Sequence, residues 1–349
     1  MPRIADFVVA CSIYLYETEQ DATEGSRVGG SGFLAHVPSR VSPSMGHLYA
    51  ITNKHVVEKD CGVIRLSRKT GGFDTIITKY QDWFIHPDGD DVAALPLNLT
   101  DETMSQFAWW SVGTDMFITR EIIEAYRVGI GDEAFMVGRL MSHDGRQKNA
   151  PVIRFGNISL MADPTEPIRC EGRDCEGFLV ECRSLSGFSG SPVFVQTTQV
   201  YRNEQAKRVH EMEVTKQQIA VPPPPPTQNS GMRLVPVSFQ GTWGPWLLGI
   251  DWGHMPLYRS VERNGVKDVS LRVELNTGIA CVAPVWKIMD VLNLEELMKE
   301  RAKEDRAIES REKHEASAVS DVATKQEPFT RTDFETALKK ASRKITSDK

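Results

Sequence analysis

The sequence predicts a mainly β protein, a barrel or a sandwich, that ends in a helical tail. Short runs of β-branched and aromatic residues recur from the start of the chain to about residue 195, and glycine or proline separates them. Repeated short strands with such turns are typical of barrels and sandwiches, whereas alternating strands and helices would indicate a parallel sheet. After Pro284 the apolar residues recur at helical spacing instead.

The strand signal lies in short runs of apolar, β-branched or aromatic residues. These runs are residues 7–10, 12–16, 63–66, 75–77, 83–85, 134–137, 246–250 and 278–282. A polar segment from about 196 to 235 separates the last two from the rest, and it contains five consecutive prolines at 222–226. Such a tract favours extended polyproline II structure and cannot lie inside a sheet. Because strand signals resume afterwards, we expect a surface insertion; a docking site for an SH3-like partner is the alternative.

Two regions follow from this pattern: a domain over residues 1–294 and a charged tail over 295–349. In the helix expected after Pro284, five apolar residues recur at helical spacing. They are Val285, Ile288, Met289, Leu292 and Leu297. From about residue 300 the chain is rich in charged residues of both signs and in alanine, which is typical of a solvated helix or a disordered tail. The tail or the proline tract could recruit a protein partner.

Composition excludes several classes of function. The formal net charge of −6 argues against a general nucleic-acid binder. The sequence contains no run of about 18 apolar residues, so we expect no membrane-spanning helix. The apolar run at 7–10 is too short for a signal peptide. We therefore expect a cytoplasmic protein whose six cysteines are thiols. Cys170 and Cys175 lack a second ligand pair, so we expect no metal.

Three motifs contain residues that could form one reactive site. A strand-like run leads into His55, Asp91 comes directly before an apolar strand, and Ser189 lies between glycines on a turn before another strand. Each motif alone is common. Their chain order of histidine, aspartate and serine is that of one known serine-hydrolase triad.

The chemistry explains why these residue types would act together. A serine hydroxyl is a weak nucleophile and needs an adjacent base, and histidine exchanges protons near neutral pH. A carboxylate fixes the imidazole tautomer and stabilises the imidazolium. The backbone N–H groups of Gly187 and Ser189 could form the oxyanion hole. The sequence thus predicts His55 as base, Asp91 as orienting acid and Ser189 as nucleophile, with no cofactor.

These motifs resemble the trypsin-like serine peptidases of chymotrypsin fold, particularly the bacterial members. The resemblance rests on Gly30 to Leu34, Thr52 to Val57, Asp91 to Leu95, Gly187 to Pro192, Gly249 to Gly253 and Gly278 to Ala280, and covers about residues 5 to 293. It implies two antiparallel β-barrels with the triad between them. It also implies an endopeptidase acting on protein or peptide substrates through an acyl-enzyme.

The resemblance also implies substrate-binding residues. The substrate would pair with the backbone of Asp251, Trp252 and Gly253. Arg183 would lie at the base of the specificity pocket and, if buried there, would favour acidic side chains; the alternative is that Arg183 faces solvent. The sequence departs from the family pattern at Phe188, where an acid or amide is usual, and at Asp251, where a serine is frequent. These departures keep an alternative open, a catalytically silent peptidase fold that binds peptides or proteins.

Overall fold

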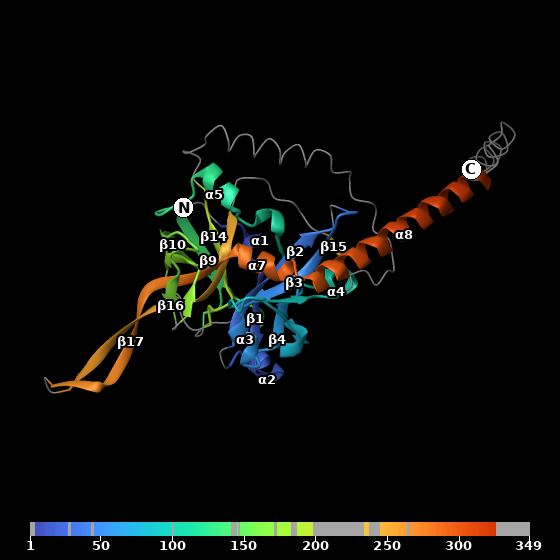
Figure 1. The fold of residues 1–349 in the computed structure, drawn as a ribbon. Coiled ribbons are helices and arrows are strands. Elements are labelled where there is room, and N and C mark those ends of the chain that lie inside the picture. Colours follow the sequence, from blue (N-terminus) through green and yellow to red (C-terminus); the bar gives the residue numbers. More distant parts are fainter. Residues whose placement is uncertain are drawn as a thin grey trace, which may run out of the picture. The chain divides into compact units, whose positions relative to one another are not determined.

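The computed structural model describes residues 4–325 except 27–28, 43–44, 100, 141–144, 146, 171–172, 183–186, 198–233, 237–244 and 264–265. The chain divides into two compact units, Met1–Arg301 and Ala302–Lys349. The first unit contains all the described strands (Figure 1). The proline tract and the end of the tail lie outside the described residues.

The N-terminal half of the first unit, joined by the later strand β15, forms a nine-stranded sheet. Its order is β5-β4-β1-β2-β3-β7-β6, with β8 paired to β2 and β15 paired to β3. The pairs are antiparallel except β2 with β8. The bounds of these strands are β1 Ser12–Tyr16, β2 Gly30–Pro38, β3 Met45–Thr52, β4 Val63–Ser67, β5 Phe73–Ile77, β6 Phe84–Ile85, β7 Ala93–Pro96, β8 Val112–Gly113 and β15 Leu234–Pro236.

Alternation along these strands explains the sheet. In β1, Ile13 and Leu15 face one buried cluster, whereas Tyr14 and Tyr16 face another. This period of two is what a pleated strand imposes on its side chains. The first cluster gathers residues from five strands, including Leu34 of β2, so the sheet curls around a core of its own.

The C-terminal half is a closed six-stranded antiparallel barrel in the order β10-β13-β17-β16-β14-β9. Its strands are β9 Glu133–Gly138, β10 Val152–Leu160, β13 Phe178–Glu181, β14 Pro192–Val195, β16 Trp246–Arg263 and β17 Val266–Pro284. A small hairpin, β11 Ile168–Cys170 with β12 Arg173–Cys175, forms a separate sheet. Beyond the barrel, β16 and β17 continue as a long two-stranded ribbon that projects away from it (Figure 1).

Seven α-helices and two 3₁₀ turns connect these strands in the described part of the chain. They are α1 Asp6–Val9, α2 Glu19–Glu24, α3 Lys54–Glu58, α4 Asp101–Ser105, α5 Arg120–Tyr126, α7 Val285–Leu292 and α8 Glu295–Lys325, with η1 Tyr80–Asp82 and η2 Thr114–Met116. The predicted helix after Pro284 is α7, which buries Val285, Ile288 and Leu292 against the barrel core.

The structure confirms a mainly β fold with a C-terminal helix, and it corrects one element. Residues 7–10 were expected to form a strand, but residues 6–9 are the short helix α1. An apolar run of this length fits a buried helical turn as well as a strand, and only packing decides between them. Here the turn buries Val8, and the carbonyl of Cys11 then accepts the N–H of Leu34. Among the described residues the structure shows one closed barrel, and the strand pairing of the N-terminal sheet forms an open path.

Candidate active site

The histidine and the aspartate meet because their strands are neighbours. Thr52 at the end of β3 pairs with Ala93 at the start of β7, so the residues just beyond these two ends lie side by side. His55 is in the first turn of α3, and its Nδ1 lies 2.5 Å from Oδ2 of Asp91. The backbone N–H of His55 donates to Oδ1 of the same carboxylate, at 2.8 Å. Both carboxylate oxygens are therefore engaged by one residue.

Asn53 fixes the backbone from which the carboxylate projects. Its side-chain amide is buried and donates from Nδ2 to the carbonyl of Asp91, at 2.8 Å. The side chain of Asp91 is 9% exposed and that of His55 is 26% exposed. Because an ionised carboxylate only accepts, Nδ1 carries the hydrogen in the pair and Nε2 is left as the basic nitrogen.

Ser189 lies on a tight turn that two glycines make possible. Gly187 and Gly190 have φ angles of 93° and 90°, in the region that favours glycine. The N–H of Ser191 donates to the carbonyl of Phe188 at 2.8 Å and closes the turn. Ser189 is half-buried at its tip, and β14 begins directly after the turn.

Ser31 of β2 attaches this turn to the N-terminal sheet. Its N–H donates to the carbonyl of Ser189 at 2.8 Å, and its hydroxyl donates to the carbonyl of Gly187 at 2.7 Å. Its own carbonyl accepts the hydroxyl of Thr52, at 2.7 Å. A Cβ on Gly190 would lie 1.9 Å from the same carbonyl oxygen, so the approach requires glycine at 190. The nucleophile turn is thus held against the strand end that precedes His55.

The turn and the histidine helix meet around Gly30. A Cβ built on Gly30 would lie 2.7 Å from the side chain of Val56 and 3.1 Å from the carbonyl oxygen of Ser189. Val56 directly follows His55. The structure therefore brings the backbones of the predicted base and nucleophile to one place. Among the hydrogen bonds of the described residues, none joins the hydroxyl of Ser189 to His55.

The predicted oxyanion donors lie on the same turn. The carbonyl of Gly187 is engaged by Ser31. The N–H groups of Gly187 and Ser189 donate to no other residue in the part of the chain that the structure describes. Both N–H groups therefore lack a hydrogen-bond acceptor among the described residues.

The substrate-binding prediction is answered only in part. Arg183 lies outside the described residues. The side chain of Asp251 is fully buried, and burial together with the Asp251 charge raises the pKa of the Cys182 thiol to about 12. The backbone of Asp251 is also engaged, since its N–H donates to Ser191 and its carbonyl accepts the N–H of Gly190. Asp251 therefore packs against the nucleophile turn, and its carboxylate does not line an open groove.

Trp252 and Gly253 come directly after this contact. The pairing of β16 with β17 shifts register between Asp251 and Gly253, which places Trp252 at a bulge. The Trp252 side chain is 3% exposed, so only its backbone could meet a substrate. The Phe188 ring is fully buried as well, and the guanidinium of Arg154 lies 4.9 Å from its centre. An apolar residue at 188 therefore fills space where the resembled family usually has a polar one.

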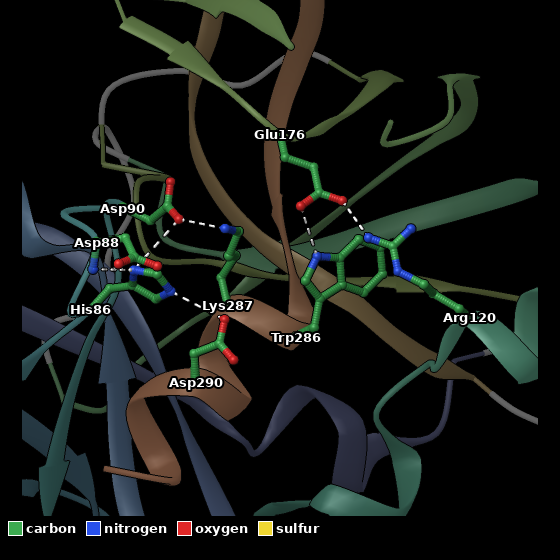
Figure 2. A network of polar contacts seen from close by, with 8 residues as sticks. All are labelled: His86, Asp88, Asp90, Arg120, Glu176, Trp286, Lys287 and Asp290. Atoms are coloured by element: carbon green, nitrogen blue, oxygen red, sulfur yellow. Dashed lines mark hydrogen bonds and ion pairs between the residues drawn. The ribbon is translucent and has the colours of Figure 1, made fainter. Parts of the chain in front are cut away.

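A polar network joins the loop before Asp91 to helix α7 (Figure 2). Nζ of Lys287 lies 2.8 Å from Oδ2 of Asp90. The imidazole of His86 is fully buried, and its Nε2 lies 3.3 Å from Oδ2 of Asp290. Partial burial acts to lower the pKa of Lys287, but Asp90, with smaller contributions from other carboxylates, outweighs it and raises that pKa. Lys287 and Asp290 of α7 thus contact the loop that carries Asp91, through Asp90 and His86.

The same helix is fixed at its start by a second network (Figure 2). Glu176 accepts the indole N–H of Trp286 at 3.2 Å and lies 2.7 Å from the guanidinium of Arg120. The guanidinium also lies 4.5 Å from the centre of the Trp286 ring. Helix α7 therefore connects the barrel side to the loop that carries the predicted acid.

Sequence reasoning missed the residues that assemble the site: Ser31, Thr52 and Asn53. Each lies within or beside a motif that was recognised, but its role depends on a partner that is distant in sequence. Ser31 between two glycines was the one visible signal, since such a string permits close backbone approach. The contacts of Lys287 and Asp290 had no sequence signal.

Four buried cysteines form no disulfide: Cys11, Cys61, Cys182 and Cys281. The thiol pKa is raised in three of them, Cys11, Cys61 and Cys182. Burial raises the pKa of Cys61 to about 11, with a further contribution from Glu17, and it also raises the pKa of Cys11. Such thiols are poor nucleophiles at neutral pH. None of the three therefore competes with Ser189 as a nucleophile.

Within the described ranges, no group of three or more histidine, cysteine, aspartate or glutamate side chains could hold a metal ion. Nor does a helix of this part of the chain combine the length and apolar character needed to cross a membrane. No family model matches the sequence, and no curated protein matches it significantly. The geometry of the site is therefore the main basis for assigning a function.

Proposed function

We propose that this protein is a serine endopeptidase of the trypsin-like family, in which His55, Asp91 and Ser189 form the catalytic triad. The observation that carries the proposal is the His55–Asp91 pair, in which both carboxylate oxygens engage the histidine, beside a turn that holds Ser189 through Ser31. Structural ion pairs are common, but this one lies beside a turn that carries a half-buried serine.

The arrangement supports acyl transfer. Nε2 of His55 takes the hydroxyl proton as Oγ of Ser189 attacks the scissile carbonyl carbon. The resulting oxyanion accepts hydrogen bonds from the backbone N–H groups of Gly187 and Ser189. The imidazolium, stabilised by Asp91, then returns its proton to the leaving amine as the C–N bond breaks. In the second half of the reaction, water attacks the serine ester and gives a proton to Nε2 of His55. The ester bond then breaks and the imidazolium gives that proton to Oγ of Ser189, so no cofactor is required.

The proposal extends to the fold and the compartment. The separate buried core of the N-terminal sheet supports a second barrel-like half, as in the two-barrel architecture of chymotrypsin type. Buried free thiols support a reducing, cytoplasmic compartment, and the resemblance supports a bacterial type. The substrate would be a protein or peptide.

A second candidate is a silent peptidase fold that binds polypeptides. It is favoured by the described hydrogen bonds, which include the His55–Asp91 bond but none from Ser189 to the imidazole. The two candidates differ in one measurable property, the reactivity of Ser189.

Labelling with a fluorophosphonate probe tests the proposal, because only an activated serine reacts quickly with it. We expect the wild-type protein to be labelled and the modified peptide to contain Ser189. Ser189→Ala should abolish labelling, whereas Ser191→Ala, a change two residues away on the same segment, should leave the site of labelling unchanged. A folded wild-type protein that remains unlabelled would favour the binding module.

A further inference from the structure

The ribbon formed by β16 and β17 has an open edge that begins at the candidate active site. On one side β16 pairs with β14 only from Trp246 to Ile250, where the chain of β14 turns away toward Ser189. On its other side β16 pairs with β17 as far as Arg263. From Trp252 outward, β16 thus has a single strand partner among the described residues, and the short β11 lies close to it without pairing.

One face of this ribbon carries three exposed apolar side chains together with the exposed Arg259, which pairs with Val273. Leu257 pairs with Leu275, and Val273 is two residues from Leu275 and therefore on the same face. Their exposed fractions are 43%, 39% and 48%. The opposite face is polar, since Glu274 accepts from Tyr258 and lies 3.0 Å from Nε2 of His254.

A two-stranded ribbon with an exposed apolar face is only marginally stable alone, and a third strand would stabilise it. An open edge presents a row of backbone donors and acceptors to such a strand. In β16 this row is interrupted at Pro256, which has no N–H. The feature that indicates the occupant is the position of the edge. It starts at the segment next to the Ser189 turn, where Gly190 donates to the carbonyl of Asp251.

The direction of the strands then decides which part of a substrate lies on the ribbon. Since β16 runs outward from Asp251, a strand added antiparallel to it would run inward and reach Ser189 at its C-terminal end. The residues on the amino-terminal side of the scissile bond would therefore lie along the ribbon. Alternate side chains of that segment would contact the face formed by Leu257, Val273 and Leu275.

We propose that the outer part of the β16–β17 ribbon is a docking arm for an extended, unfolded polypeptide substrate, which adds as a strand along β16 upstream of the scissile bond. The proposal rests on the peptidase function argued above. It names the substrate class as unfolded chains with alternating apolar residues several positions before the cleavage site. Short or folded substrates would use the site poorly, because they forgo the contacts that the arm provides.

Peptides of graded length test the proposal. The cleavage sites in unfolded β-casein are first mapped, and peptides are then made around the strongest site. All share the same carboxyl-terminal part, and they carry about three, six or nine residues before the scissile bond. We expect kcat/KM to rise at least about tenfold from the shortest to the longest peptide, the effect of one or two net hydrogen bonds.

The variant Leu257→Asp places a charge on the apolar face of the arm. We expect it to abolish the gain with length while kcat/KM for the shortest peptide stays within about twofold of wild type, which also reports that the site is folded. Ile130→Asp is the matched control, because Ile130 is an exposed apolar residue, 70% accessible, outside the ribbon. That control should keep the full gain with length.

The remaining outcomes are distinguishable. Equal kcat/KM for all lengths, or a gain that survives Leu257→Asp, overturns the docking arm and leaves the peptidase function intact. Absence of both peptide cleavage and fluorophosphonate labelling removes the function itself, and the arm with it. Sedimentation of a dimer that Leu257→Asp dissociates, without any dependence on peptide length, would assign the edge to a second copy of the chain instead.

Discussion

At the scale of single residues, Gly190 shows how closely the nucleophile turn approaches β2. Its φ angle of 90° is nearly the same as the 89° of Gly71. The surroundings differ, because a Cβ at 190 would meet the Ser31 carbonyl oxygen at 1.9 Å whereas a Cβ at 71 would have no neighbour within 4 Å. A substitution at Gly71 would therefore cause backbone strain alone, whereas a substitution at Gly190 would add a steric conflict with Ser31.

We expect Gly71→Ala to lower the free energy of unfolding by about 1 kcal/mol, the cost of a left-handed alanine. Gly190→Ala should cost about 3 kcal/mol or more, because the turn must also move away from Ser31. Urea unfolding of both variants measures the difference. Equal losses in the two variants would mean that the turn yields freely, and that Ser31 does not fix its position.

At the scale of elements, the strands were more predictable than the site. Runs of β-branched and aromatic residues marked eight segments, and seven of them overlap strands, because a pleated strand needs such residues at such spacing. Residues 7–10 were the exception, since tertiary packing and not the local pattern makes them a helical turn. The hydrogen bonds from Ser31 to the turn of Ser189 could not be predicted, because they join residues more than a hundred positions apart.

The contact between α7 and the loop before Asp91 gives a prediction for an element. Lys287→Met keeps the length of the side chain but removes the ion pair with Asp90, so the loop that carries Asp91 should be less well held. The pair is only partly buried, so we expect kcat/KM to fall about fivefold, equivalent to ~1 kcal/mol.

Lys299→Met is the matched control, since Lys299 pairs with Glu295 on the exposed surface of α8. That variant should have the kcat/KM of wild type. Steady-state kinetics on the same casein-derived peptide compares the two. A loss shared by both variants, or by neither, would show that α7 does not position the acid.

At the scale of the whole molecule, acid should weaken the fold through His36 of β2. Burial lowers the pKa of this imidazole to about 4, opposed by a smaller contribution from its hydrogen bond with Ser111. A histidine that resists protonation in the folded state contributes stability above its unfolded pKa of about 6.5. That stability, about 3 kcal/mol at most, is lost as pH falls from 6.5 toward 4.

Urea unfolding at pH 7 and pH 4.5 checks this expectation. We expect wild type to lose about 2 kcal/mol more than His36→Gln between the two pH values, because glutamine does not titrate. Asp115, whose pKa is raised by burial, contributes with the opposite sign and is common to both proteins. An identical pH dependence in the two proteins would contradict the assignment to His36.

The overall architecture shows what a sequence can and cannot indicate at this scale. The mainly β class and the C-terminal helix follow from local periodicity, which is why they were predictable. Closure of the C-terminal barrel depends on β9 pairing with both β10 and β14, which lie on opposite sides of it. Such pairing has no local signal. The length of the β16–β17 ribbon was not predicted, although Val269, Leu271, Val273 and Leu275 alternate with polar residues as in a strand.

The central claim is that His55 and Ser189 act as one catalytic unit, and a double-mutant cycle tests it most directly. We expect His55→Ala, Ser189→Ala and the double variant to cleave β-casein at the same residual rate, each lower than wild type by about 10⁴-fold or more. Residues that act together are grossly non-additive when removed. Losses that add on a logarithmic scale, or a Ser189→Ala variant as active as wild type, would contradict the account.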